Sequence, residues 1–135
     1  MKTVVASGYF DPIHVGHVEY LEMAASLGDR LVVIVNSDLQ AELKKGESFM
    51  NENDRLKIVS SLRVVDDVLL SIDKDKTVCE SLKFLKPDIF AKGGDRTNNE
   101  IPESKTCKEF NIKIIDGLGQ KIRSSSKLTG LKKLK

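Results

Sequence analysis

The chain has 135 residues, which is enough for one domain with a hydrophobic core and too few for two. Apolar residues make up 40% of the sequence and charged residues 31%, which excludes a disordered chain. The 22 basic and 20 acidic residues leave a net charge of +2, a smaller basic excess than a general nucleic-acid binder needs.

Membrane and secretory classes are also disfavoured. No apolar run reaches the roughly 18 residues that cross a membrane, and the first residues lead directly into a predicted strand, without a secretory pattern. Cys79 and Cys107 lack the spacing of paired metal ligands, so we expect reduced thiols. The chain is therefore expected to be a single cytoplasmic domain over residues 1–135 that binds neither membrane nor nucleic acid.

Apolar runs that predict strands alternate with helical patterns along the chain. Strands are expected near residues 3–8, 31–36, 66–71, 88–92 and 112–116. Helices are expected near 15–27, 51–63, 77–86 and 102–109, and a last helix is expected to begin near 124. Such alternation predicts an α/β fold with a mainly parallel five-stranded sheet and helices on both faces. In such sheets ligands bind beyond the carboxyl ends of the strands, here in the loops 8–14, 37–50, 72–76, 93–101 and 117–124.

The first of these loops carries the most informative segment. Residues 8–17 read Gly-Tyr-Phe-Asp-Pro-Ile-His-Val-Gly-His, so His14 and His17 share one face of the first turn of a predicted helix. A helix start has unpaired N–H groups and a partial positive charge, which favours phosphate binding. A metal site is an alternative, although Asp11 is the only nearby further ligand; a histidine that caps the helix is another. Gly16 would leave space for a ligand near the backbone.

Further charged residues have both a structural and a functional interpretation. Asp11 is either a turn carboxylate or an orienting group near phosphates, with magnesium as an indirect partner. Lys44 and Lys45 precede Gly46 in a basic turn, and such lysines are often simply solvent charges. The two arginines of the second predicted helix, Arg55 and Arg63, are either surface groups or ligands of an anion.

Two late segments also lie where a parallel sheet binds ligands. Residues 92–96 read Lys-Gly-Gly-Asp-Arg directly after the fourth strand, and the glycines permit close approach of a ligand or form a plain turn. Residues 122–127 read Ile-Arg-Ser-Ser-Ser-Lys at a predicted helix start. Those serines either cap the helix or bind a phosphate, and the second phosphate-binding helix start at His14 favours the latter.

Residues 8–17 match the signature Gly-x-Phe-Asp-x-x-His-x-Gly-His, and through it the chain resembles the cytidylyltransferase-like nucleotidyltransferases over nearly its whole length. Residues 45–48 and 92–95 resemble the adenylyltransferase that acts on glycero-manno-heptose 1-phosphate. The compact length and the Arg55–Arg63 pair also resemble glycerol-3-phosphate cytidylyltransferase.

The resemblance implies a Rossmann-like three-layer sandwich, a homodimer, and a reaction of a nucleoside triphosphate, bound with Mg²⁺, with a phosphorylated sugar or alcohol. The catalytic residues that it implies bind phosphates and stabilise the transition state: His14, His17, Lys44, Lys45 and Arg63. The nucleotide-binding residues that it implies are Tyr9, Phe10, Asp11, Gly16, Gly93, Gly94, Asp95, Arg123, Ser124, Ser125 and Ser126. The residues that it implies for the acceptor are Asp38, Arg55 and Arg96.

The sequence departs from the family pattern at three places. Arg96 replaces a usual aromatic residue, Ser-Ser-Ser replaces Ser-Thr-Thr, and Arg123 directly precedes the serines, whereas the glycerol-3-phosphate enzymes have their arginine several residues earlier. The favoured hypothesis is a heptose 1-phosphate type adenylyltransferase, and the alternative is a glycerol-3-phosphate type cytidylyltransferase. Outside these enzyme classes, a nucleotide-binding regulatory module without turnover and a zinc-binding protein remain as hypotheses.

Overall fold

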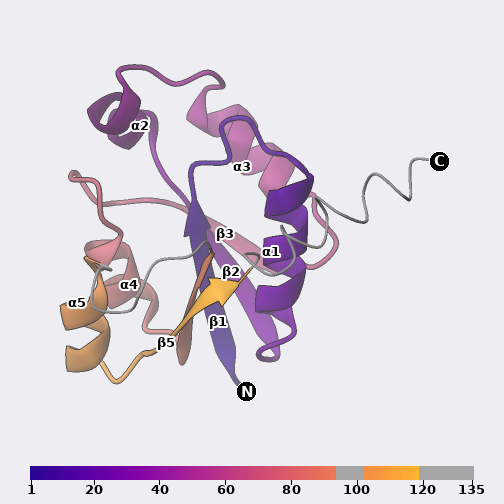
Figure 1. Ribbon diagram of the computed structural model, residues 1–135, viewed down its shortest axis with the longest axis vertical. Coiled ribbons are helices and arrows are strands. Elements are labelled where there is room, and N and C mark those ends of the chain that lie inside the picture. Colours follow the sequence, from indigo (N-terminus) through magenta and orange to yellow (C-terminus); the bar gives the residue numbers. More distant parts are fainter. Residues whose placement is uncertain (94–101, 119–135) are drawn as a thin grey trace.

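The computed structural model describes residues 1–93 and 102–118, and it forms one five-stranded sheet (Figure 1). The strands are β1 (Thr3–Gly8), β2 (Arg30–Val35), β3 (Asp67–Leu70), β4 (Ile89–Gly93) and β5 (Lys113–Leu118). Their order is β3-β2-β1-β4-β5, and every neighbouring pair is parallel. The predicted α/β, Rossmann-like fold with its parallel sheet is confirmed.

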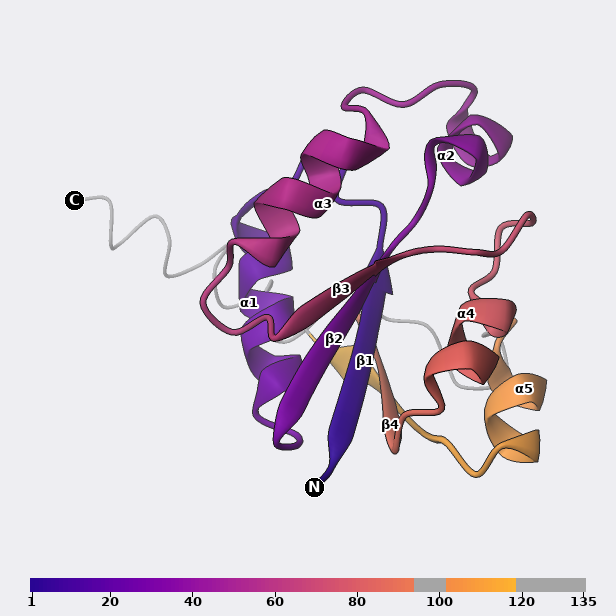
Figure 2. The ribbon, with the colours of Figure 1, turned by 180° about the vertical axis from the view of Figure 1, so that it is seen from behind.

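Helices cover both faces of this sheet. The described helices are α1 (Val15–Ala25), α2 (Asp38–Lys45), α3 (Glu52–Ser60), α4 (Cys79–Leu85) and α5 (Ser104–Glu109). Figures 1 and 2 show α1 and α3 on one face and α4 and α5 on the other, while α2 lies beyond the ends of the strands. Among the described residues, no helix is long and apolar enough to span a membrane.

Helix α2 corrects the prediction of a loop over residues 37–50. Only Gln40 and Ala41 of this helix are buried, and Leu39 and Leu43 are exposed, so α2 has little apolar surface packed against the core. The signal was instead local. Ser37 Oγ accepts from the Gln40 N–H, and the Gln40 side chain accepts from the Ser37 N–H, which is a capping box. The helix expected from residue 124 lies outside the described residues.

The central strands β1, β2 and β4 are buried on both faces, as the continuous apolar run of β2 predicted, whereas the edge strand β3 is only partly buried. Alternate residues of a strand point to opposite faces of a sheet. In β1, Val4 and Ala6 therefore pack in the core under α1 and α3, and Val5 packs in the core under α4 and α5. In β4, Phe90 lies on the second face between Ile89 and Ala91 on the first.

The strand order places a crevice at the carboxyl edge of the sheet. From β1 the chain moves outward to β2 and β3, and then returns to the other side of β1 to add β4 and β5. The order thus reverses between β1 and β4, and open α/β sheets bind ligands at such a switch point. Helix α1 also begins at this edge, directly after the loop that follows β1.

Candidate functional site

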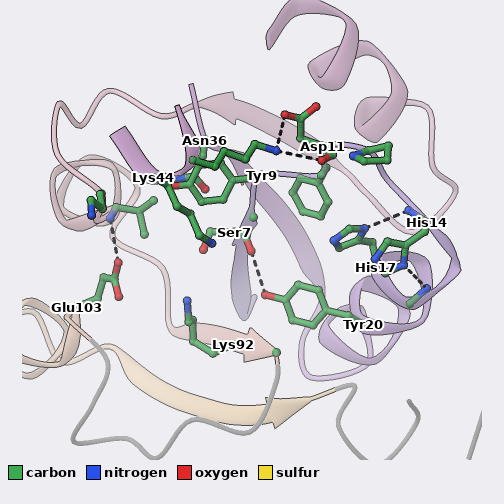
Figure 3. Close-up of a pocket in the computed structure, with 18 of the residues that line it drawn as sticks. Ser7, Tyr9, Asp11, His14, His17, Tyr20, Asn36, Lys44, Lys92 and Glu103 are labelled. Carbon is green, nitrogen blue, oxygen red and sulfur yellow. Dashed lines mark hydrogen bonds and ion pairs between the residues drawn. The ribbon is translucent and has the colours of Figure 1, made fainter. Parts of the chain in front are cut away.

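A pocket of about 940 Å³ lies at this switch point, beyond the ends of β1 and β4 (Figure 3). A volume of this order suits a ligand of nucleotide size. The structure brings nine of the predicted residues to the pocket wall: Tyr9, Phe10, Asp11, His14, Gly16, His17, Lys44, Lys45 and Gly93. Residues from loops far apart in the sequence therefore meet at one site.

His14 and His17 both cap helix α1 and line the pocket. The Nδ1 atom of His14 accepts from the Gly16 N–H at 3.1 Å, and the Nδ1 atom of His17 accepts from the His14 N–H at 3.1 Å. The capping role and the pocket role are therefore compatible. Because Nδ1 is an acceptor in each ring, the proton of a neutral imidazole is on Nε2. The cap thus makes both histidines Nε2–H donors.

The protonation state of His17 supports this donor role. Burial and the neighbouring His14 lower the pKa of His17 to about 4, so its ring is neutral at pH 7. The two imidazole centroids are 4.0 Å apart, and the Phe10 ring contacts His17 edge-on at 5.1 Å between centroids. The backbone caps and the ring contacts hold the imidazoles in place without a ligand.

Two glycines of the motif make room for protein side chains. A Cβ atom on Gly16 would lie 2.9 Å from Cε1 of His14, so glycine lets that ring fold back over the helix start. The His14 ring therefore fills the space that a Cβ would occupy, while Gly16 itself lines the pocket. A Cβ on Gly8 would lie 2.9 Å from Cζ of Phe10, a buried residue with φ of 53°. Phe10 forms the floor of the pocket as part of the core.

Asp11 connects the loop that follows β1 to the segment before α3 through hydrogen bonds. Its Oδ1 accepts from the Met50 N–H at 2.6 Å, and its Oδ2 accepts from the Phe49 N–H at 2.8 Å. The ammonium of Lys45 lies 2.8 Å from the same Oδ2. Burial opposes ionisation of Asp11, but the Lys45 hydrogen bond and the two N–H donors outweigh it and hold the pKa of Asp11 below its usual range. Asp11 is therefore an anchor of the loop.

The two lysines of α2 differ in their surroundings. Lys45 is paired with Asp11. The Lys44 ammonium instead lies 4.6 Å from the centre of the Tyr9 ring, at the pocket wall. Burial raises the pKa of the Tyr9 phenol, so this ring is neutral at pH 7. Lys44 is thus the lysine whose charge faces the pocket without a carboxylate partner among the described residues.

Arg55 is a buried organiser of the loops around the pocket. Its Nη2 donates to Asp38 Oδ1 at 2.6 Å, its Nη1 donates to the carbonyls of Tyr9 and Asn36, and its Nε donates to the Met50 carbonyl. Four of the five guanidinium N–H donors are used in this way. Neither Arg55 nor Asp38 lines the pocket, so the structure does not bring this pair to the place expected for the acceptor.

Arg63 lies at the opposite edge of the sheet. Helix α3 runs from the carboxyl edge back to the amino edge, and Arg63 is an exposed residue in the turn between its end and the start of β3. It is absent from the pocket lining. The structure thus corrects the expectation that Arg63 reaches a triphosphate. The remaining predicted residues, Gly94, Asp95, Arg96, Arg123, Ser124, Ser125 and Ser126, lie outside the described residues.

Several residues of the pocket were not predicted from the sequence. These are Ser7, Tyr20, Asn36, Lys76, Val78, Lys92, Pro102 and Glu103. Lys76 ends the predicted loop 72–76, and Lys92 ends the predicted strand 88–92 and opens the segment 92–96, so both positions carried a usable signal. Tyr20 and Glu103 gave none, because each lies inside a predicted helix. The Tyr20 hydroxyl donates to the Ala91 carbonyl at 2.7 Å, which joins α1 to β4 under the pocket.

A divalent cation does not have a protein-only site here. Both Asp11 oxygens are engaged by protein donors, and no group of three or more His, Cys, Asp or Glu side chains within residues 1–93 and 102–118 could hold a metal. A zinc site at His14 and His17 is disfavoured for the same reason, and because both Nδ1 atoms are already hydrogen-bonded.

Known proteins are similar to this chain in sequence and in fold. Residues 5–129 match the model of the family described as cytidylyltransferase-like. The chain belongs to the cytidylyltransferase-like family. The resemblance drawn from the histidine motif is confirmed, and the family and its relatives support the expectation of a nucleotidyltransferase enzyme.

Similar proteins include two that carry the name bifunctional protein HldE. The chain is 40% identical over 119 residues to that of Aliarcobacter butzleri and 40% identical over 117 residues to that of Nitratiruptor sp.. These matches cover 86% and 85% of this chain, which spans about a quarter of the length of each relative (25% and 24%). A solved structure, the lipopolysaccharide core biosynthesis protein of Thermoplasma volcanium, is 34% identical with a TM-score of 0.74, and the match covers 86% of this chain and 95% of that one.

Proposed function

We propose that this chain transfers AMP from ATP to the phosphate of a heptose 1-phosphate type acceptor and releases pyrophosphate. The observation that carries the proposal is the capped histidine pair at the start of α1: the caps use both Nδ1 atoms, which leaves two Nε2–H donors on rings that line a pocket of nucleotide size. The resemblance of residues 45–48 and 92–95 to heptose 1-phosphate adenylyltransferases supports the sugar phosphate. The names of the relatives, HldE and lipopolysaccharide core biosynthesis protein, agree with that choice.

The reaction needs positioned donors more than it needs a proton acceptor. A phosphate oxygen of the acceptor attacks the α-phosphorus in line; the new P–O bond forms as the bond to the bridging β-phosphate oxygen breaks. The electron pair leaves with pyrophosphate. The attacking phosphate is already anionic, so no general base is required. Catalysis is then orientation together with stabilisation of the charge that grows on the transferred phosphoryl group.

The pocket offers matched groups for that charge. The Nε2–H donors of His14 and His17 would stabilise the non-bridging oxygens of the α-phosphate, and neutral His17 donates without having to lose or gain a proton. The Lys44 ammonium would supply a fixed positive charge for phosphate. Mg²⁺ would enter with the nucleotide phosphates, since the described residues provide no cluster for it.

A substrate matrix tests the proposal. The purified chain is mixed with Mg²⁺, each of the four nucleoside triphosphates, and a panel of sugar 1-phosphates and glycerol 3-phosphate, and pyrophosphate release is recorded. The largest kcat/KM is expected with ATP and a glycero-manno-heptose 1-phosphate. Preference for CTP and glycerol 3-phosphate would replace the proposal with the cytidylyltransferase alternative. Calorimetric binding of a nucleotide without any release of pyrophosphate would favour a regulatory module.

A further inference from the structure

One buried carboxyl oxygen in the pocket is unused by the protein. Glu103 is 4% exposed, and its Oε2 accepts from the Val78 N–H at 3.0 Å. Its Oε1 is also buried and has no hydrogen-bond partner; among the buried side-chain oxygens and nitrogens that the structure describes, it alone is in this state. An unsatisfied buried acceptor costs free energy, and such an atom in a binding pocket marks a place for a donor.

The position of Glu103 indicates that it contacts a part of the ligand other than the phosphates. It lines the same pocket, but Figure 3 shows it on the side away from His14 and His17. It comes from the segment before α5, which covers the opposite face of the sheet from α1. A carboxylate repels phosphate, so its partner must be an uncharged or cationic donor group that extends away from the reacting phosphates.

The surroundings of Glu103 fit a hydroxyl better than a nucleotide base. Recognition of a base usually includes an aromatic ring on which the base stacks. The rings of Tyr9 and Phe90 each have a lysine ammonium over a face, at 4.6 Å for Lys44 and 5.6 Å for Lys92, and Phe90 is fully buried. Lys76 and Lys92 line the same pocket, and a hydroxyl can donate to the Glu103 carboxylate while it accepts from an ammonium group.

We propose that Glu103 Oε1 accepts a hydrogen bond from a hydroxyl group of the phosphorylated acceptor, and that this contact selects polyhydroxylated acceptors. The inference rests on the proposed function, since it requires that a sugar phosphate enters this pocket. The contact orients the acceptor through its hydroxyls, while His14, His17 and Lys44 bind the phosphates at the other side of the pocket.

The test compares Glu103→Gln with the wild type in the pyrophosphate assay, using the sugar 1-phosphate with the largest wild-type kcat/KM. The amide carbonyl of the variant side chain can keep the bond from the Val78 N–H, so the variant loses the second acceptor with little change of shape. The KM for the sugar phosphate should rise about 10- to 100-fold, the range for a hydrogen bond to a charged group. The KM for ATP should change less than about twofold. Glu109→Gln, which alters an exposed carboxyl at the end of α5, is the matched control and should behave as the wild type.

Deoxy analogues of the sugar phosphate separate a ligand contact from a structural effect. If Glu103 binds one hydroxyl, the penalty of Glu103→Gln should vanish for the analogue that lacks this hydroxyl and persist for the others. An equal penalty for every analogue, or a rise in the KM for ATP alone, would overturn the proposal. Glu103→Asp serves as a second variant if Glu103→Gln unfolds. It keeps the charge but shortens the side chain by one methylene group, and it should show the same dependence on the analogue.

Direct binding separates this proposal from the proposed function. Calorimetry of the sugar 1-phosphate with wild type and Glu103→Gln, without nucleotide, should show weaker binding to the variant by the same factor. Binding that depends on Glu103 in a chain that releases no pyrophosphate would contradict the proposed function and keep the hydroxyl contact. Turnover with unchanged binding in the variant would contradict the contact and keep the function.

Discussion

Two groups of charged and polar side chains lie at the carboxyl edge of the sheet, and they differ in what they contact. In the first group, Arg55 pairs with Asp38 and Lys45 pairs with Asp11. These side chains use most of their donors and acceptors on the protein itself. In the second group, His14, His17 and Lys44 line the pocket, and the Nε2 atoms and the Lys44 ammonium are not needed for the caps or for an ion pair. The comparison shows that hydrogen-bond partners, and not charge, separate the loop scaffold from the ligand-binding groups.

The first group should matter most for stability. Arg55→Ala leaves the partly exposed Asp38 carboxylate and three carbonyls without their donor, and the loss of these four hydrogen bonds should cost about 3–5 kcal/mol, at about 1 kcal/mol each. Urea denaturation should show this loss in the free energy of unfolding. Arg30→Ala, which breaks an exposed pair with Asp67, is the control and should cost about 1 kcal/mol or less. Equal free energies of unfolding for the two variants would contradict the structural role assigned to the first group.

The second group should matter most for turnover. His14→Ala and His17→Ala should each lower kcat about 100- to 1,000-fold, as does the loss of a donor to a transition-state oxyanion. His14→Asn is the sharper variant, because asparagine retains a cap for helix α1 but has no imidazole. Thermal unfolding of His14→Asn should be close to that of the wild type while its kcat is as low as that of His14→Ala. Near-normal turnover in all three variants would remove the histidines from the proposed chemistry.

The two adjacent lysines offer a direct comparison of the two groups. Lys44→Ala should lower kcat/KM about 10- to 100-fold through loss of a charged phosphate contact, with little change in the free energy of unfolding. Lys45→Ala should instead cost about 1 kcal/mol of stability, because it breaks the pair with Asp11, and it should raise the pKa of Asp11. Kinetic assays and urea denaturation of both variants measure the contrast. The reverse pattern would show that Lys45 leaves Asp11 to bind phosphate.

A further expected effect is a pH dependence of stability at His17. Its pKa in the folded chain is about 4, below the usual value near 6.5, so the unfolded chain binds more protons between these pH values. The contribution of His17 to stability is therefore complete above pH 6.5 and declines as the pH falls towards 4. As the pH falls from about 7.5 to about 4.5, the free energy of unfolding should decrease more for the wild type than for His17→Asn. A difference that does not change with pH would contradict the lowered pKa.

The sequence by itself determined the alternation of the five strands with most of the helices, and the location of the histidine-containing loop that lines the pocket. A strand buried on both faces is a continuous apolar run, as in residues 31–35, and such patterns can be identified without knowledge of the partners. The histidine spacing, the glycine between the histidines and the position after β1 are also local. Helix α2 was missed because it is short and polar, and its clearest local signal, the capping box of Ser37 and Gln40, was not used.

The tertiary structure decided which charged residues face a ligand, because their partners come from distant parts of the chain. Arg55 contacts the Tyr9 carbonyl 46 positions away, and Lys45 contacts Asp11 34 positions away, which no local pattern specifies. Because α3 runs towards the amino edge of the sheet, Arg63 lies at that edge, away from the pocket. The packing of α5 places Glu103 at the pocket wall. Residue type gave each of these groups its chemistry, and long-range packing decided whether that chemistry is used inside the protein or offered to a substrate.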